Sequence, residues 1–160
     1  MTSLSVRHAT GAPEPVRFAA SELAAYLGRM AGQPIAVVAA SGPGWPQLEL
    51  RVGPAGRAAA EPARLAEGLA SRVRPLPAPY ATTPGPDAFL WRTGGGEAAI
   101  AGTNGRSVLF GVYDLLEGLG CRFFGASDGD EVVPRLAGDP FTGADERFEQ
   151  ATFPFRERHF

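Results

Sequence analysis

A glycine-rich segment between a predicted strand and a predicted helix, residues 102–107 (GTNGRS), has the residue types of an anion-binding turn. Such a turn presents backbone amides and the positive end of a helix dipole, which together hold phosphate groups in many proteins. A P-loop, however, needs glycine at position 100 and lysine at position 106, where this chain has Ile100 and Arg106. The dinucleotide-binding motif Gly-x-Gly-x-x-Gly also needs glycine at position 100. We therefore interpret the segment as a structural turn, with anion binding as the less favoured alternative.

Two groups of carboxylates have the residue types of a metal or catalytic site. Asp128, Asp130 and Glu131 share one predicted loop, but the twelfth position of a calcium loop starting there would be position 139, which is aspartate rather than glutamate. Asp114 and Glu117 lie three residues apart on the polar side of a predicted helix. A glycosidase instead needs two carboxylates that face each other across about 5–9.5 Å. We interpret both groups as solvated.

Nucleophilic chemistry is restricted by the residues that the chain lacks. It contains no lysine, so it can form no Schiff base. Cys121 is the one cysteine; it has apolar neighbours and is interpreted as a small packed residue. His8 and His159 lie near opposite ends of the sequence, and the spacing places no nucleophile beside either. We predict no catalytic residue, no cofactor-binding residue, no cofactor and no metal ligand in this chain.

Aromatic side chains are the remaining candidates for ligand contact, because their faces stack on the apolar faces of sugar rings. Trp45 lies in the turn at residues 42–46 (GPGWP) and is the residue we select as a candidate carbohydrate contact. Tyr80, Trp91 and Tyr113 are the other members of a conceivable stacking platform. Trp91 and Tyr113 lie in predicted regular elements, so we interpret them as core residues.

Length and composition fit one domain. A chain of 160 residues can bury a core without disulfides or a structural metal. The net charge is −2 and no basic stripe is present, so we expect no nucleic-acid partner. No apolar run reaches the roughly 18 residues that cross a bilayer, so we expect no membrane partner. Residues 1–8 lack a basic stretch followed by an apolar run, and thus show no signal peptide; the compartment stays open.

The first half of the chain contains one clear helix and three candidate strands. Residues 3–7 alternate like a short strand, and apolar residues from Val16 to Met30 recur with the spacing of a helix that ends before Gly32. Residues 35–39 are short and β-branched enough for a buried strand, and residues 47–52 alternate like a half-buried strand. Residues 58–72 favour a helix, and the proline-rich residues 75–86 predict a loop.

The second half adds a hairpin and the clearest helix. Residues 88–92 and 97–101 read as strands on either side of three glycines, which indicates an antiparallel hairpin. Apolar residues from Val108 to Leu119 then follow helical spacing, and Gly120 ends the helix. Residues 122–124 and 131–133 are predicted to be extended, and the last twenty residues show no clear period. This mixed order predicts an α+β fold, a two-layer mixed β-sheet with helices packed on one face.

A family resemblance rests on the glycine turn and the helix after it. Residues 109–113 read LFGVY, and Leu115, Leu116, Glu117, Gly120 and Arg122 follow in order. This order resembles the N-terminal domain of alpha-glucuronidases and related glycoside hydrolases, whose helix reads Leu-Tyr-Gly-Val-Tyr-x-Phe-Leu-Glu-x-x-Gly and is followed by x-Arg-Trp. Phe110, Leu115 and Phe123 stand where the family more often has Tyr, Phe and Trp.

Other segments agree with the same family in order. Residues 19–27 and 32–35 resemble its first helix and the exit from that helix, and residues 50–53, 87–89 and 131–134 resemble later segments. Residues 153–158 (FPFRER) resemble the segment that leads into the first strand of the family's catalytic barrel. The chain is also similar to the N-terminal domain of beta-N-acetylhexosaminidases. The resemblance covers nearly the whole chain and is weakest between residues 56 and 86.

The resemblance implies a non-catalytic role. In these enzymes a small sheet covered by helices packs against a (β/α)₈ barrel, and the barrel carries the catalytic carboxylates. Residues 1–152 would form the N-terminal α+β accessory domain, and residues 153–160 a linker or the start of the barrel. The implied partners are the barrel in the same polypeptide and a polysaccharide. The face that contacts the barrel is expected to be apolar and to include part of the cluster Phe148, Phe153 and Phe155. The alternative is a free-standing carbohydrate-binding module.

Overall fold

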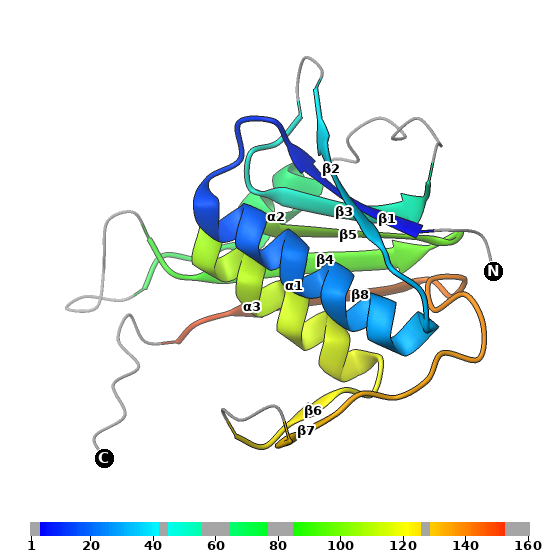
Figure 1. Ribbon diagram of the computed structural model, residues 1–160. Helices are drawn as coiled ribbons and strands as arrows, with labels where there is room; N and C mark the ends of the chain where they lie inside the picture. The colour runs from blue at the N-terminus through cyan, green and yellow to red at the C-terminus, as the bar shows by residue number, and fades with distance from the viewer. Residues whose placement is uncertain (1–3, 42–44, 56–64, 77–84, 126–128, 153–160) are drawn as a thin grey trace.

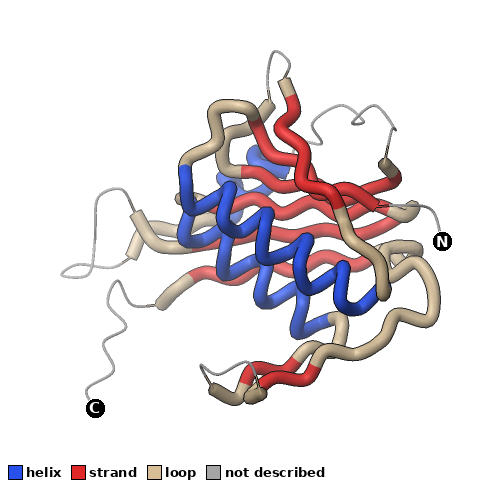
Figure 2. The backbone as a smooth tube through the Cα atoms, viewed as in Figure 1, coloured by secondary structure: helices blue, strands red, loops and turns tan. Residues whose placement is uncertain are grey.

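The computed structural model describes residues 4–41, 45–55, 65–76, 85–125 and 129–152. Two long helices lie side by side in front of one large sheet, and a short helix lies behind it (Figures 1 and 2). The elements in chain order are β1 (Leu4–Ala9), α1 (Glu14–Ala31), β2 (Ala36–Ala40), β3 (Glu49–Pro54), α2 (Leu65–Arg72), β4 (Ala88–Gly94), β5 (Glu97–Gly102), α3 (Gly105–Gly118), β6 (Arg122–Phe123), β7 (Glu131–Val132) and β8 (Asp145–Gln150).

A mixed sheet of six strands, in the order β2-β1-β3-β5-β4-β8, forms the body of the fold. β1 and β2 are parallel because α1 carries the chain back along the sheet between them, and the other neighbouring pairs are antiparallel. Val6 lies opposite Val52, and Leu50 lies opposite Ile100, so apolar side chains of successive strands line the same face. The predicted α+β class with a mixed sheet is confirmed.

Helix α1 has the boundaries that its sequence indicates. Pro15 stands in the first turn, where a residue without an N–H is tolerated. Gly32 ends the helix in the left-handed conformation, with a φ of 69°, and its amide donates to the Gly28 carbonyl. The stripe from Val16 to Met30 is buried against the sheet, as the apolar spacing predicts.

Helix α3 begins at a capped turn and comes very close to the sheet. Oδ1 of Asn104 accepts a hydrogen bond from the Ser107 amide at 2.9 Å, which satisfies one of the free N–H groups of the first turn. At Gly111, an added Cβ would lie 2.8 Å from Cγ2 of Ile100 and 3.2 Å from Cγ of Phe89. Gly111 therefore sets how closely α3 packs on β4 and β5.

The opposite face of the sheet is covered in part by α2. Leu65 and Leu69 of this helix form a small cluster with Leu90 and its neighbours. Phe89 and Trp91, which flank Leu90 and point the other way, belong to the main core under α1 and α3. The prediction of helices on one face thus describes α1 and α3, whereas α2 lies on the other face.

Three strands lie in environments that their sequences do not indicate. Residues 35–39 are predicted to be a buried strand, but β2 is an edge of the sheet and four of its five residues are exposed. β3 is predicted to be half buried, but it lies inside the sheet, and Glu49 and Arg51 are buried with the apolar residues. Residues 145–150 show no clear period, yet they form β8, the other edge. Sheet position, rather than local pattern, decides each case.

Two hairpins complete the described structure. β4 and β5 are joined by Gly95 and Gly96, whose φ values of 62° and 82° explain why the turn uses glycine. The predicted extended pieces at residues 122–124 and 131–133 pair as the antiparallel β6 and β7. Residues 58–64 of the predicted second helix, and most of the predicted loop at 75–86, lie outside the described residues. No helix among the described residues is long and apolar enough to cross a membrane.

Candidate functional site

The glycine-rich turn before α3 is filled by a carboxylate of the chain itself. Asp87 accepts hydrogen bonds from Nδ2 of Asn104 at 2.6 Å and from Oγ of Ser107 at 3.3 Å, and it pairs with Arg106 at 2.6 Å. Gly102 is needed for a close approach, because a Cβ there would lie 2.6 Å from the Val108 nitrogen. Asp87 thus takes the place of an external anion, which favours the structural interpretation of this turn.

Asp114 is not the solvated residue that its sequence position suggests. Its carboxylate accepts a hydrogen bond from Nε1 of Trp91 at 2.6 Å and forms an ion pair with Arg147 at 3.3 Å. It therefore links α3 to β4 and β8. Trp91 is buried in the core, as predicted, and this bond satisfies its indole N–H. Glu117, on the same helix, is exposed.

Of the acidic residues Asp128, Asp130 and Glu131, the last is the first residue of β7 and contacts the helical side of the molecule. Glu131 accepts a hydrogen bond from the Tyr26 hydroxyl at 2.5 Å and forms an ion pair with Arg29. It is therefore a partner of α1 rather than a freely solvated residue. Asp128 lies outside the described residues. Within the described ranges, no group of three or more His, Cys, Asp or Glu side chains is placed to hold a metal ion.

The histidine and cysteine candidates occupy ordinary core positions. His8 is buried, and its Nδ1 lies 2.8 Å from the Ala9 carbonyl oxygen. Cys121 is buried, with Sγ 3.9 Å from Sδ of Met30, and burial raises the pKa of its thiol. A thiol held in its neutral form is a poor nucleophile. His159 lies outside the described residues.

Trp45 is half-buried rather than fully displayed. Its ring packs against the edge of the main core, and the guanidinium carbon of Arg51 lies 5.8 Å from the ring centroid. This cation–π contact occupies part of the surface that a sugar ring would use. Residues 42–44 of the same turn and Tyr80 lie outside the described residues. The carbohydrate contact at Trp45 stays a prediction.

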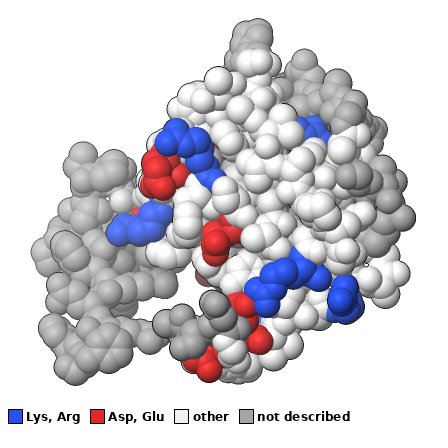
Figure 3. Space-filling model, viewed as in Figure 1, with Lys and Arg blue, Asp and Glu red and all other residues white. Residues whose placement is uncertain are grey.

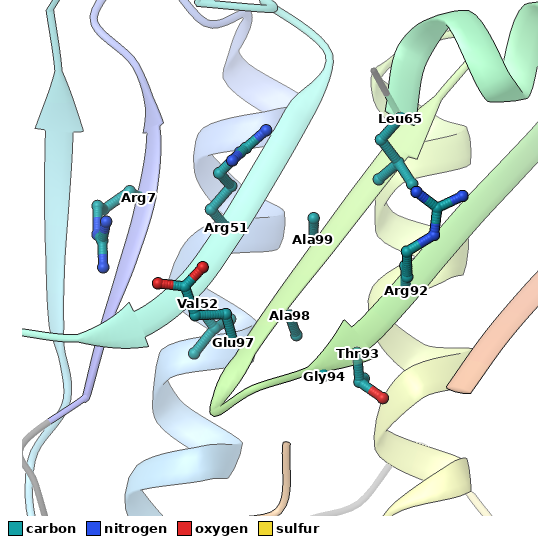
Figure 4. Close-up of a pocket in the computed structure, with 10 residues that line it drawn as sticks. All are labelled: Arg7, Arg51, Val52, Leu65, Arg92, Thr93, Gly94, Glu97, Ala98 and Ala99. Carbon is teal, nitrogen blue, oxygen red and sulfur yellow. The ribbon is translucent and has the colours of Figure 1, made fainter. Parts of the chain in front are cut away.

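A hollow on the α2 side of the sheet is lined by several arginines. Its volume is about 290 Å³, and Figure 4 shows Arg7, Arg51 and Arg92 projecting from three different strands, with their guanidinium groups apart rather than aimed at one point. Each has an internal partner. Arg7 donates to the Pro54 carbonyl at 3.2 Å, Arg51 pairs with buried Glu49 at 2.7 Å, and Arg92 pairs with Glu146. We assign no ligand to this hollow.

A larger hollow lies on the outer side of α1 and α3, beside the β6–β7 hairpin. We call it the helical groove; its volume is about 870 Å³. Figure 3 views the molecule from this side and shows a mostly uncharged surface with separate acidic and basic groups. Its side chains are Glu22, Tyr26 and Arg29 from α1, Phe110, Tyr113 and Glu117 from α3, and Phe123 and Glu131 from the hairpin strands.

Three aromatic rings form the floor of the helical groove. The ring of Phe123 meets those of Tyr113 and Tyr26 edge to face, with centroids 5.1 and 5.4 Å apart. The Tyr113 hydroxyl donates to Oε2 of Glu22 at 2.6 Å, and the Tyr26 hydroxyl donates to Glu131. Each phenol is thus held by a carboxylate from another segment, so the floor is preorganised.

Three side chains of the groove, Tyr26, Tyr113 and Glu131, have pKa values shifted away from those of the free side chains. Burial, followed by the hydrogen bond to Glu131, raises the pKa of Tyr26 to about 12. Burial, followed by the hydrogen bond to Glu22, likewise raises the pKa of Tyr113. The hydrogen bonds from Tyr26 and Arg29 lower the pKa of Glu131. The two phenols are therefore neutral at neutral pH and the Glu131 carboxylate is charged, so these three groups supply no activated nucleophile.

Exposed apolar side chains occur on or next to the elements that line this groove. Phe110 is 40% exposed on its wall, and Phe124, just after β6, is 76% exposed. Phe18 of α1 is 48% exposed and lies one turn before Glu22 on the same helix side. Sequence reasoning missed this surface. Its signal is the set of large apolar residues that fall outside the buried stripes of the two helices.

Comparison with known proteins gives no relative from which a site could be transferred, because no family model, no curated protein and no solved structure matches the chain.

Proposed function

We propose that this chain is the non-catalytic N-terminal accessory domain of an alpha-glucuronidase-like glycoside hydrolase, and that it braces a (β/α)₈ catalytic barrel in the same polypeptide. The observation that carries the proposal is the exposure of two phenylalanines, Phe18 and Phe110, on the otherwise mixed polar and apolar outer side of α1 and α3. A helix that buries one face against a sheet normally shows polar residues on the other. Here Phe110 is exposed in the wall of a preformed groove, and Phe18 and Phe124 are exposed on the segments that contribute to it; exposed apolar side chains that gather in this way mark interaction sites.

The residues of this surface overlap the segment that carries the family resemblance. Within residues 109–123, Val112 and Leu116 are buried, so the core of this domain accounts for them. Phe110 has no such explanation, because it is exposed and faces the groove. An aromatic residue at this position serves no fold requirement of the domain itself, which favours a role in docking.

The docking surface that we propose differs from the one that the sequence suggests. Phe148 is half-buried and packs beside Leu65 and Leu69 on the α2 side of the sheet, away from the helical groove. Phe153 and Phe155 lie outside the described residues. The proposed contact with the barrel therefore uses the helical groove and its rim, with Phe110 near its centre.

The mass of the native protein tests this function. An antibody against the domain should detect a product several hundred residues longer than the 16.7 kDa chain. That product should release uronic acid from glucuronic-acid-bearing polysaccharide, whereas the 160-residue chain should release none. A native product of 16.7 kDa would refute the proposal.

In the longer protein, Phe110→Ser should lower the melting temperature more than in the isolated chain. The control, Ala66→Ser, changes an exposed residue of α2 on the other face of the sheet and should affect both chains alike.

A further inference from the structure

Strand β2 is an unusual sheet edge because it is exposed, apolar and uncharged. Its five residues, AVVAA, pair with β1 on one side only, and no other described strand pairs with its outer side. Val37 and Val38, on opposite faces of the strand, are 40% and 43% exposed. Residues 30–48 contain no charged side chain. Exposed edges are normally blocked with charges, prolines or bulges, because their free backbone groups can pair with another chain.

The other edge of the same sheet has such a block. β8 reads DERFEQ, with four charged residues in six. Glu146 pairs with Arg72 and Arg92, and Arg147 pairs with Asp114 and Glu149, so these charges are held in place along the strand. One sheet therefore has one protected edge and one open edge. Both strands are edges of the same sheet, so being an edge does not by itself explain why β8 is charged and β2 is not.

The backbone of β2 directs a defined set of hydrogen-bonding groups outward. The Ala40 carbonyl accepts from the Thr10 amide at 2.9 Å on the β1 side. Successive residues of a strand point their amide and carbonyl to opposite sides, so those of Val37 and Ala39 point away from β1. Two residues thus offer two donors and two acceptors at the open edge.

An apolar groove lies beside this edge on the α1 side of the sheet. Its volume is about 550 Å³. Most of its lining is apolar, with Ala24, Ala25, Gly28, Pro34, Ile35 and Val37, and it also includes Ser21, Arg29, Gly32 and Gln33. A strand added to β2 would place alternate side chains along this groove. Strand addition gains affinity from main-chain hydrogen bonds and further contact from such pockets.

We propose that two copies of this chain form a symmetric dimer by antiparallel pairing of their β2 strands, with the two-fold axis at Val38. In this register Val37 lies opposite Ala39 of the partner copy on both sides of the axis. Their outward amides and carbonyls then form four hydrogen bonds, and the two Val38 side chains meet at the axis. The proposal goes beyond the accessory role, since it concerns β2, the sheet edge opposite β8, and not the helical groove.

Self-pairing fits the charges better than pairing between unlike edges. Because β2 has no charge, two copies meet without repulsion. Pairing of β2 with β8 of another copy would place apolar residues against the ion-paired strand and would continue from copy to copy as an open filament. Pairing of β2 with β2 uses the same patch on both copies, so assembly stops at two.

Sedimentation equilibrium of the 160-residue chain, over about a hundred-fold range of concentration, tests the dimer because mass action makes its population depend on concentration. We expect the average mass to rise from one chain towards two. Ala39→Pro removes an outward amide without touching the pairing with β1, as a proline on an edge strand can. It deletes two of the four hydrogen bonds and should raise the dimer dissociation constant about 10-fold or more. Val38→Glu places two carboxylates together at the axis and should have a similar effect.

Val132→Glu is the matched control, since Val132 is a 51% exposed strand valine on β7, remote from β2. It should leave the dissociation constant unchanged. Circular dichroism and the urea midpoint should show that Ala39→Pro remains folded. A wild-type chain that stays monomeric at every concentration overturns the proposal, and so does a dimer that both β2 variants leave intact.

Discussion

Replacing Gly111 with alanine should destabilise the chain, although alanine is the better helix former. In a helix interior the change from glycine to alanine gains about 1 kcal/mol. At this position, however, the new Cβ would lie 2.8 Å from Ile100 and 3.2 Å from Phe89, inside the packed interface between α3 and the sheet. Overpacking of a close-packed core costs about 1–3 kcal/mol. We therefore expect a net loss of about 1 kcal/mol in the free energy of unfolding.

Urea denaturation gives this free energy, and a thermal scan should show a melting temperature lower by about 2–4 °C, the shift typical for a domain of this size. Gly118→Ala is the matched control, because Gly118 lies on the same helix and an added Cβ there would have no atom within 4 Å. That variant should be unchanged or up to about 0.5 kcal/mol more stable. If Gly111→Ala is as stable as Gly118→Ala, the close approach of α3 to the sheet is not what requires glycine.

Two further contacts give predictions that urea unfolding can check. Asp114→Ala leaves the buried Trp91 indole N–H without its acceptor and should lower the free energy of unfolding by about 1–3 kcal/mol. Asp114→Asn keeps an acceptor oxygen and should lower it less. Equal losses in the two variants would contradict the role of this hydrogen bond. Because the folded-state pKa of Glu131 is lowered, its contribution to stability is present above the ordinary glutamate pKa and is lost as the pH falls through the lowered value. Glu131→Gln should therefore flatten the acid limb of the stability profile.

The elements that the sequence predicts well are those whose signal is local. The apolar spacing from Val16 to Met30, with Gly32 after it, determines α1 because helix hydrogen bonds join residues four positions apart. The glycines between β4 and β5 likewise mark their own turn. The exposure of β2 and the membership of β8 were not predictable in this way, because a strand's neighbours are chosen by distant segments.

The candidate site shows the same division. The sequence assigns Phe110 and Tyr113 to a helix and predicts Tyr113 to be a core residue, but both line the helical groove, and Tyr113 is only partly buried. The hydrogen bond between Tyr26 and Glu131 joins residues 105 positions apart, so only the folded chain brings them together. Trp91 lies in the core, as its predicted strand indicates. The prediction that Asp114 is solvated is wrong, because the indole that it binds lies on another element.

Asp87 makes the junction between β5 and α3 independent of anything dissolved around it. A turn that holds phosphate is complete only when its ligand is bound, and its order then follows the ligand concentration. Here the anion is part of the chain and is delivered to the helix terminus by the strand that follows it, β4, at a fixed high effective concentration. The start of α3, and with it the wall of the helical groove, is therefore assembled by folding alone. A motif search that reads this turn as a nucleotide-binding loop would mistake a turn occupied by the chain's own carboxylate for an empty binding site.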